Sequence, residues 1–184
     1  MSAADTPAPL SFRAATAADV GAVVALVEST YRGEASRAGW TTEADLLDGR
    51  RTGNDEIEAI LARDHSCLLL AEQDGALVGC AHVAVEHDAG YFGMFSVVPA
   101  RQGRGLGKQV LAEAERIAAD EWGCTLMRMT VIDVRDDLMA FYERRGYRRT
   151  GIRKPFPYGD ERFGLPKRGD LRFEVLEKSL GGAS

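Results

Sequence analysis

Three apolar runs separated by two short turns occupy the middle of the 184-residue chain. The runs are CLLLAE (67–72), LVGCAHVAVE (77–86) and YFGMFSVV (91–98), and the turns between them are QDGA and HDAG. Asp and Gly suit the tight turns that join neighbouring antiparallel strands. The pattern therefore predicts an antiparallel meander of three strands, which the rest of the chain extends or covers.

Helical and extended patterns alternate on both sides of this meander. Apolar residues at helical spacing predict helices at 17–32, 55–63, 105–121 and from Asp136 to Gly146, with a short candidate at Glu43–Asp48. Further strands are predicted at 10–15, 125–132, 147–152 and 171–180, and a long loop containing Pro and Gly at 153–170. This order predicts a mixed α/β domain in which helices flank a central sheet.

Length and composition predict one folded domain. Residues 1–9 are small, polar and Pro-containing, so we expect a disordered tail followed by a single domain at 10–184. The start lacks the basic and apolar regions of a signal peptide, and no apolar run is long enough to span a membrane. A net charge of -5 disfavours a general nucleic-acid binder, because phosphate contacts call for a basic surface.

The three cysteines and three histidines are not spaced as metal ligands. The cysteines are odd in number and include no CxxC pair, which also argues against a disulfide framework. We therefore expect a cytoplasmic protein without a metal site.

A basic, glycine-rich turn, RQGRGLGK (101–108), joins the last strand of the meander to the next helix. It is not a Rossmann fingerprint, because Lys108 stands where the third glycine would be. It is not a Walker A loop either, since Gln102 replaces the first glycine and Gln109 replaces the Ser or Thr. The turn can still hold an anion, because glycines allow close backbone approach and a helix N-terminus presents free N–H groups.

The turn fits another pattern, Q/R-x-x-G-x-G/A, and resembles the acetyl-CoA pyrophosphate loop of the GNAT superfamily of acyltransferases. The preceding FSVVP is similar to the family's L-x-V-x-P strand, with Phe95 in place of the usual Leu. Further on, LMAFYERRGY (138–147) resembles the family's second signature. The resemblance implies a GNAT fold, with a twisted, mostly antiparallel sheet of about six to seven strands between helices.

The resemblance also implies acetyl-CoA as a co-substrate and no metal. In the family the strand before the loop splays, its backbone binds the pantetheine arm, and the loop binds the diphosphate. Arg104 and Lys108 can add charge-assisted hydrogen bonds. The implied coenzyme-binding residues are Val97, Val98, Pro99, Gln102, Gly103, Arg104, Gly105, Leu106, Gly107 and Lys108.

The activity implied by the resemblance is acetyl transfer to a primary amine by direct attack in a ternary complex. The departing thiolate gains from a proton donor, and a neutral phenol can serve, because tyrosine has a pKa of about 10 and a thiol of about 8.5. In the family a tyrosine of the second signature often has this role, and the matching residue here is Tyr142. Direct attack needs no covalent intermediate, so the cysteines are not expected to be nucleophiles.

Two positions depart from the family pattern. Arg135 stands where many members have a coenzyme-binding Asn, and it could reach a phosphate or have no role. Residues 91–98 hold no carboxylate, although some members carry a general-base Glu there. Deprotonation would then use a water, Glu86, or an acid such as Glu34 or Glu43. These departures leave one alternative, a non-catalytic acyl-CoA-binding sensor or regulatory module on the same fold.

Two segments are available for the acceptor, one after the first long helix and one in the loop 153–170. Both mix aromatic and charged residues, as ligand-facing loops do. The candidate acceptor residues are Tyr31, Arg32, Glu34, Trp40, Phe156 and Tyr158. The sequence leaves open an amino acid, a polyamine, an antibiotic, a peptide N-terminus or a lysine side chain, and a homodimer is compatible with the resemblance.

Overall fold

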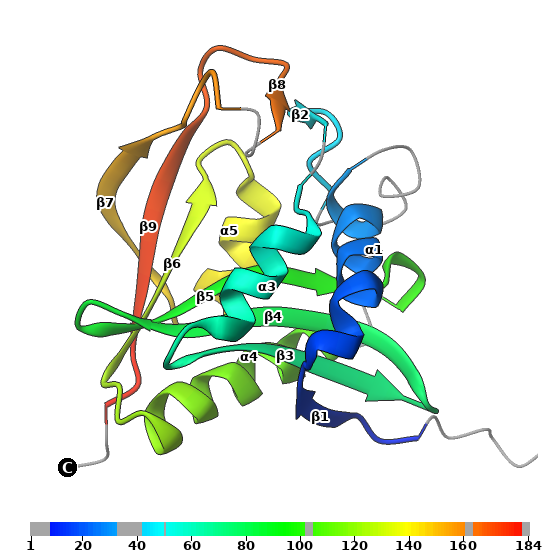
Figure 1. The fold of residues 1–184 in the computed structure, drawn as a ribbon. Coiled ribbons are helices and arrows are strands. Elements are labelled where there is room, and N and C mark those ends of the chain that lie inside the picture. Colours follow the sequence, from blue (N-terminus) through cyan, green and yellow to red (C-terminus); the bar gives the residue numbers. More distant parts are fainter. Residues whose placement is uncertain (1–7, 33–41, 50, 102–104, 161–163, 182–184) are drawn as a thin grey trace, which may run out of the picture.

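The computed structural model describes residues 8–32, 42–49, 51–101, 105–160 and 164–181. Within them, a seven-stranded sheet in the order β1-β3-β4-β5-β6-β9-β7 has helices on both faces (Figure 1). Its strands are β1 (Ser11–Ala14), β3 (Ser66–Gln73), β4 (Ala76–Glu86), β5 (Ala89–Val97), β6 (Leu126–Ile132), β7 (Arg148–Pro155) and β9 (Arg172–Ser179). Every neighbouring pair is antiparallel except β5 and β6, which confirms the predicted mixed α/β fold.

The helices also follow the expected pattern. They are α1 (Val20–Tyr31) after the 3-10 turn η1 (Ala17–Asp19), α3 (Asn54–Ala62), α4 (Leu106–Arg116) and α5 (Asp136–Glu143). A second 3-10 turn, η2 (Pro99–Arg101), follows β5, and α4 ends in a π-helical turn, η3 (Ile117–Glu121). The predicted helix at 105–121 is therefore α4 together with η3.

Two sequence-based expectations are wrong. Glu43–Asp48 is not a helix but a turn followed by the two-residue strand β2 (Leu47–Asp48). The loop predicted at 153–170 contains the end of β7 and a second short strand, β8 (Leu165–Pro166), which pairs antiparallel with β2. Pairs this short depend on partners more than a hundred residues apart in sequence, so no local pattern predicts them.

The two faces of the sheet have different helix partners (Figure 1). On one face, α1 and α3 bury apolar residues against Leu68, Leu70, Cys80 and Met94. On the other, α4 and α5 pack against a larger apolar cluster that includes Phe92, Phe95 and Val97. The core is therefore divided into two layers by the strands that carry the predicted site.

A β-bulge in β5 determines which residues face each layer. Cys80 of β4 pairs with Ser96, whereas His82 pairs with Gly93, so β5 has one extra residue between these pairs. Met94 takes up the extra residue with φ of 50°, in the left-handed region. Because of the bulge, Phe92 and Phe95 lie on the same face, although residues three apart in a regular strand point to opposite faces.

β5 and β6 separate after Tyr91. Their parallel pairing covers only Gly90 with Met127 and Tyr91 with Arg128. The strands continue to Val97 and Ile132, but no further pairing joins them within the described residues. The expected splay therefore begins after Tyr91, just before the bulge.

Phe95 connects the bulge to the start of α4. Its ring lies 5.5 Å from that of Phe92 and stacks on Phe141 at 5.9 Å between centroids. Gly107 of α4 lies against the Phe95 ring, and a Cβ at Gly107 would approach Phe95 Cζ to 2.8 Å. Gly107 thus permits the close approach of α4 to β5, whatever its role toward a coenzyme.

We predict that Gly107→Ala lowers the free energy of unfolding by about 1–3 kcal/mol, since overpacking displaces the buried Phe95 ring. Gly21→Ala is the matched control, because Gly21 is also the second residue of its helix and a Cβ there meets nothing within 4 Å. This control is expected to gain up to about 1 kcal/mol from helix propensity. Urea unfolding measures both, and equal gains in the two variants would contradict the packing role.

Candidate active site

A cavity of about 260 Å³ lies where β5 and β6 separate. Residues 91–95 of β5 and 129–132 of β6 form its two walls. Further lining side chains come from the end of α1, the chain between α1 and α3, α3 and α5, among them Tyr31, Arg32 and Tyr142. Phe156 after β7 and Phe173 of β9 complete the lining. The splay therefore opens into a space that polar groups from both halves of the chain reach.

Tyr142 enters this cavity from α5. Only 4% of the residue is exposed, and its ring packs edge-on against Phe92, Phe141 and Tyr147. Burial holds its pKa well above the ordinary value for a phenol, so the hydroxyl is protonated at neutral pH. Among the described residues none forms a hydrogen bond with it, which leaves a neutral donor for a ligand.

Tyr31, at the last position of α1, has a different environment. Its hydroxyl donates a hydrogen bond to the carbonyl of Phe95, directly after the bulge. Burial raises the pKa of Tyr31 as well, so it remains a donor. The residue was expected to contact the acceptor. It does line the cavity, but its hydroxyl is engaged in holding β5 in its splayed path.

Tyr91 forms a further part of the wall where the strands part. A Cβ at Gly93 would lie 2.2 Å from the Tyr91 hydroxyl, so the ring extends along β5 over the glycine. Any side chain at position 93 would collide with the Tyr91 ring, so the ring can take this position only because residue 93 is a glycine. Tyr91 had not been predicted as a site residue.

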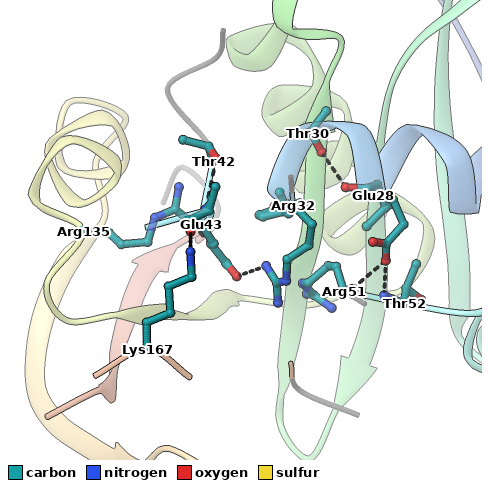
Figure 2. Close-up of polar contacts among 12 residues, drawn as sticks. Glu28, Thr30, Arg32, Thr42, Glu43, Arg51, Thr52, Arg135 and Lys167 are labelled. Atoms are coloured by element: carbon teal, nitrogen blue, oxygen red, sulfur yellow. Dashed lines mark hydrogen bonds and ion pairs between the residues drawn. The ribbon is translucent and has the colours of Figure 1, made fainter. Parts of the chain in front are cut away.

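Charged side chains from the end of α1, from the segments after it and from the start of α5 line the cavity, and Figure 2 shows the contacts of several of them. Arg32 and Arg135 both bind Glu43. Arg32 Nη1 donates to Oε2, and Arg135 Nη1 lies 3.4 Å from Oε1. All three side chains are buried. Arg135, which sequence alone could not assign, thus belongs to this network, and both oxygens of Glu43 are occupied.

A second polar contact fixes the chain before α3. Glu28 of α1 accepts hydrogen bonds from the backbone N–H groups of Arg51 (2.6 Å) and Thr52 (2.8 Å), as Figure 2 shows. The hydroxyl of Thr52 donates to Glu56 at 2.8 Å. Arg51 and Glu56 both line the cavity, and neither had been predicted, because their position depends on the contact with α1.

The chain just after the first segment expected to contact the acceptor meets the second segment through β2 and β8, which we call the β2–β8 strap (Leu47–Asp48 and Leu165–Pro166). Lys167 strengthens it, donating from its backbone to Leu46 O and from Nζ to Ala44 O. Leu47 and Phe156 pack together and line the cavity. Tyr158 does not line it. Its hydroxyl donates to Arg168 O and accepts from the Leu171 N–H, which stabilises the loop.

The predicted coenzyme segment is described in part. Gly105 has φ of 76° and precedes α4, and among the described residues no side chain caps that end of the helix. The first N–H groups of α4, in Leu106, Gly107 and Lys108, therefore lack partners within the helix. Gln102, Gly103 and Arg104 lie outside the described residues, as do Glu34 and Trp40 on the acceptor side.

Several backbone groups in the segment before α4 already have hydrogen-bond partners. Val97 ends β5, where it pairs with Gly79. The Val98 N–H donates to Val78 O, and its carbonyl accepts from the Arg101 N–H. Pro99 begins η2. A pantetheine contact at Val98 would thus use the second lone pair of its carbonyl.

The cysteines are poor nucleophiles at neutral pH. Burial raises the pKa of Cys67 to about 11 and that of Cys80 to about 12, and it also raises the pKa of Cys124. The described residues contain no cluster of His, Cys, Asp and Glu that could hold a metal ion. Nor do they include a helix long and apolar enough to cross a membrane.

Comparison with known proteins identifies related folds. The model of the Acetyltransferase (GNAT) family matches residues 24–147. Ribosomal-protein-S18-alanine N-acetyltransferase from Escherichia coli superposes with a TM-score of 0.71 at 13% identity, covering 96% of this chain and 97% of its own. The Salmonella typhimurium protein yncA, solved with its cofactor acetyl-CoA, gives 0.66 at 18% identity, covering 96% and 97%.

A spermidine N-acetyltransferase, a chimera of Vibrio cholerae SpeG and hSSAT, gives a TM-score of 0.66 at 14% identity. The match covers 93% of this chain and 95% of the chimera. No curated protein matches the sequence significantly.

Tyr31→Phe is predicted to lower the free energy of unfolding by about 1–3 kcal/mol, because the buried Phe95 carbonyl loses its donor. Tyr142→Phe removes the same atom where no described residue bonds to it, and is expected to change stability by less than about 0.5 kcal/mol. Urea denaturation of both variants makes the comparison. A loss in Tyr142→Phe as large as that in Tyr31→Phe would refute it.

Proposed function

Because the chain belongs to the GNAT family of acetyltransferases, we propose that it moves the acetyl group of acetyl-CoA to a primary amine by direct attack in a ternary complex. The observation that carries this proposal is the buried, neutral Tyr142 phenol in a cavity at the β5–β6 splay. A buried proton donor next to an opened strand suits the departure of a thiolate.

The coenzyme has a site of suitable chemistry at the start of α4. The N–H groups of Leu106, Gly107 and Lys108, which lack partners within the helix, and the helix dipole favour a diphosphate there. The Lys108 side chain adds a positive charge, and Gln102, Gly103 and Arg104 complete the loop proposed from sequence. Val97, Val98 and Pro99 lead from this loop to the splay, which is the path proposed for the pantetheine arm.

The protein's own groups then act at two points of the reaction. The amine nitrogen attacks the thioester carbonyl carbon, a C–N bond forms, and the C–S bond breaks. The Tyr142 hydroxyl donates its proton to the sulfur as it becomes a thiolate, the amine loses its proton to a base, and solvent returns a proton to the Tyr142 phenolate. A phenol with a raised pKa is a weak acid, so this donation is expected late, when the sulfur carries most of its charge.

The general base is proposed to be Glu56, acting through a water. Glu43 is unsuited to this role, because Arg32 and Arg135 occupy both of its oxygens. Glu86 pairs with Arg63 on the surface and does not line the cavity. Glu56 lines the cavity and is exposed to solvent, so a proton taken from the amine can leave by this side.

Tyr142→Phe is expected to reduce kcat by about 100-fold or more, in the range of general acid catalysis, while acetyl-CoA still raises the unfolding midpoint. Tyr147→Phe is the matched control. Its ring contacts Tyr142, but it does not line the cavity, so turnover should be preserved. Release of the free coenzyme thiol with a mixed pool of amino acids, amino-acid amides, spermidine and a short peptide is the readout.

Full turnover by Tyr142→Phe would exclude the proposed acid. Binding of acetyl-CoA by the unaltered protein without transfer to any of these amines would instead favour the non-catalytic acyl-CoA-binding module.

A further inference from the structure

We propose that the acceptor is a small amine that also carries a carboxylate, as an amino acid does, and that Arg51 binds this carboxylate. The inference rests on the proposed acetyl transfer and names the class of molecule that the cavity selects.

The charges in the cavity are the first argument. Among the described residues, its lining includes three arginines and two glutamates, namely Arg32, Arg51, Arg135, Glu43 and Glu56. The formal charge of this set is therefore one positive. A free amine that carries one carboxylate has one negative charge, so the reactive form of such an acceptor would neutralise the cavity.

The distribution of these charges points to Arg51. Glu43 is shared between Arg32 and Arg135, so these three groups already satisfy one another in part. The guanidinium of Arg51 forms no ion pair with a described residue, and Glu43 and Glu56 act on it only through longer-range electrostatics. No described residue accepts a hydrogen bond from it, and its contact is with the face of Tyr31, 5.3 Å from the ring centroid. An arginine whose side-chain N–H groups have no acceptor in a partly buried site can bind a carboxylate through two parallel hydrogen bonds.

Arg51 is also held in place for this purpose. Its backbone N–H donates to Glu28, and the neighbouring Thr52 N–H donates to the same oxygen, which ties the segment to α1. Burial opposes the charge of Arg51, but Glu43, Tyr31 and Glu56 outweigh it, so its pKa lies above the ordinary value. The guanidinium therefore stays charged in a fixed backbone frame, as an anion-binding group requires.

The same features disfavour other acceptors. A polyamine would bring further positive charges toward three arginines, which repel them in a partly buried site. A volume of about 260 Å³ lies just below the usual range for ligand pockets of about 300–1,000 Å³, and Leu47 of the β2–β8 strap forms part of its wall. The space suits a molecule of amino-acid size better than the end of a folded protein.

The first experiment compares acceptors that differ by one charge. The proteinogenic L-amino acids, their primary carboxamides and spermidine are each supplied with acetyl-CoA, and release of the coenzyme thiol is followed. At least one amino acid is expected to exceed its own carboxamide in kcat/KM by about 10- to 100-fold, the effect of a charged hydrogen bond. Amides or spermidine used as well as the amino acids would overturn the inference while leaving the acetyltransferase in place.

The second experiment assigns the effect to Arg51. Arg51→Gln should raise KM for the preferred amino acid by about 10- to 100-fold, leave kcat and acetyl-CoA affinity nearly unchanged, and abolish the preference for acid over amide. Arg51→Lys should recover part of the preference. Arg63→Gln is the control, since Arg63 follows α3 on the surface and pairs with Glu86.

Retention of the acid preference in Arg51→Gln would refute the assignment. The comparison of acid with amide in the unaltered protein remains decisive even if Arg51→Gln does not fold. Release of no thiol with any acceptor would contradict both this inference and the proposed function.

Discussion

The separation of β5 from β6 is the constraint on which the rest of the molecule depends. The pairing stops after Tyr91, and the bulge at Met94 turns Phe95 back onto the α4 face. Breaking a ladder in the middle of a sheet leaves backbone groups without partners, which is costly unless other groups replace them. The Tyr31 hydroxyl replaces one partner, and the stacking of Phe95 on Phe141 holds the new path.

The separation of the strands also determines which polar side chains reach the candidate site. Because the splay admits side chains from both layers, the neutral Tyr142 from α5 and the charged groups beside α1 line the same cavity. Buried charges are tolerated where they are paired, and Glu43 forms an ion pair with both Arg32 and Arg135. Arg51 forms no ion pair or side-chain hydrogen bond with a described residue, and we propose that this asymmetry favours an acceptor with a negative charge.

Local patterns predicted most of the fold and placed in advance the part of the candidate site that lies on regular elements. The meander, the helix after the glycine-rich turn and the Tyr142 position follow from periodicity and from two signatures. The acceptor side was predicted only in outline. Arg51 and Glu56 reach the cavity because Glu28 binds the backbone before α3, and the 43–48 segment forms β2 because β8 pairs with it. These contacts join distant parts of the chain, so no short stretch of sequence contains them.

Thermal unfolding of the unaltered protein with acetyl-CoA, beside NAD and ATP, tests most directly the claim that the splay and the start of α4 form a coenzyme site. A ligand at about a hundred times its Kd stabilises the native state by about 2.7 kcal/mol, and each kcal/mol moves Tm by about 2–4 °C in a domain of this size. A rise of several degrees with acetyl-CoA alone is the expected result. No rise with acetyl-CoA, or a larger one with NAD or ATP, would contradict the claim.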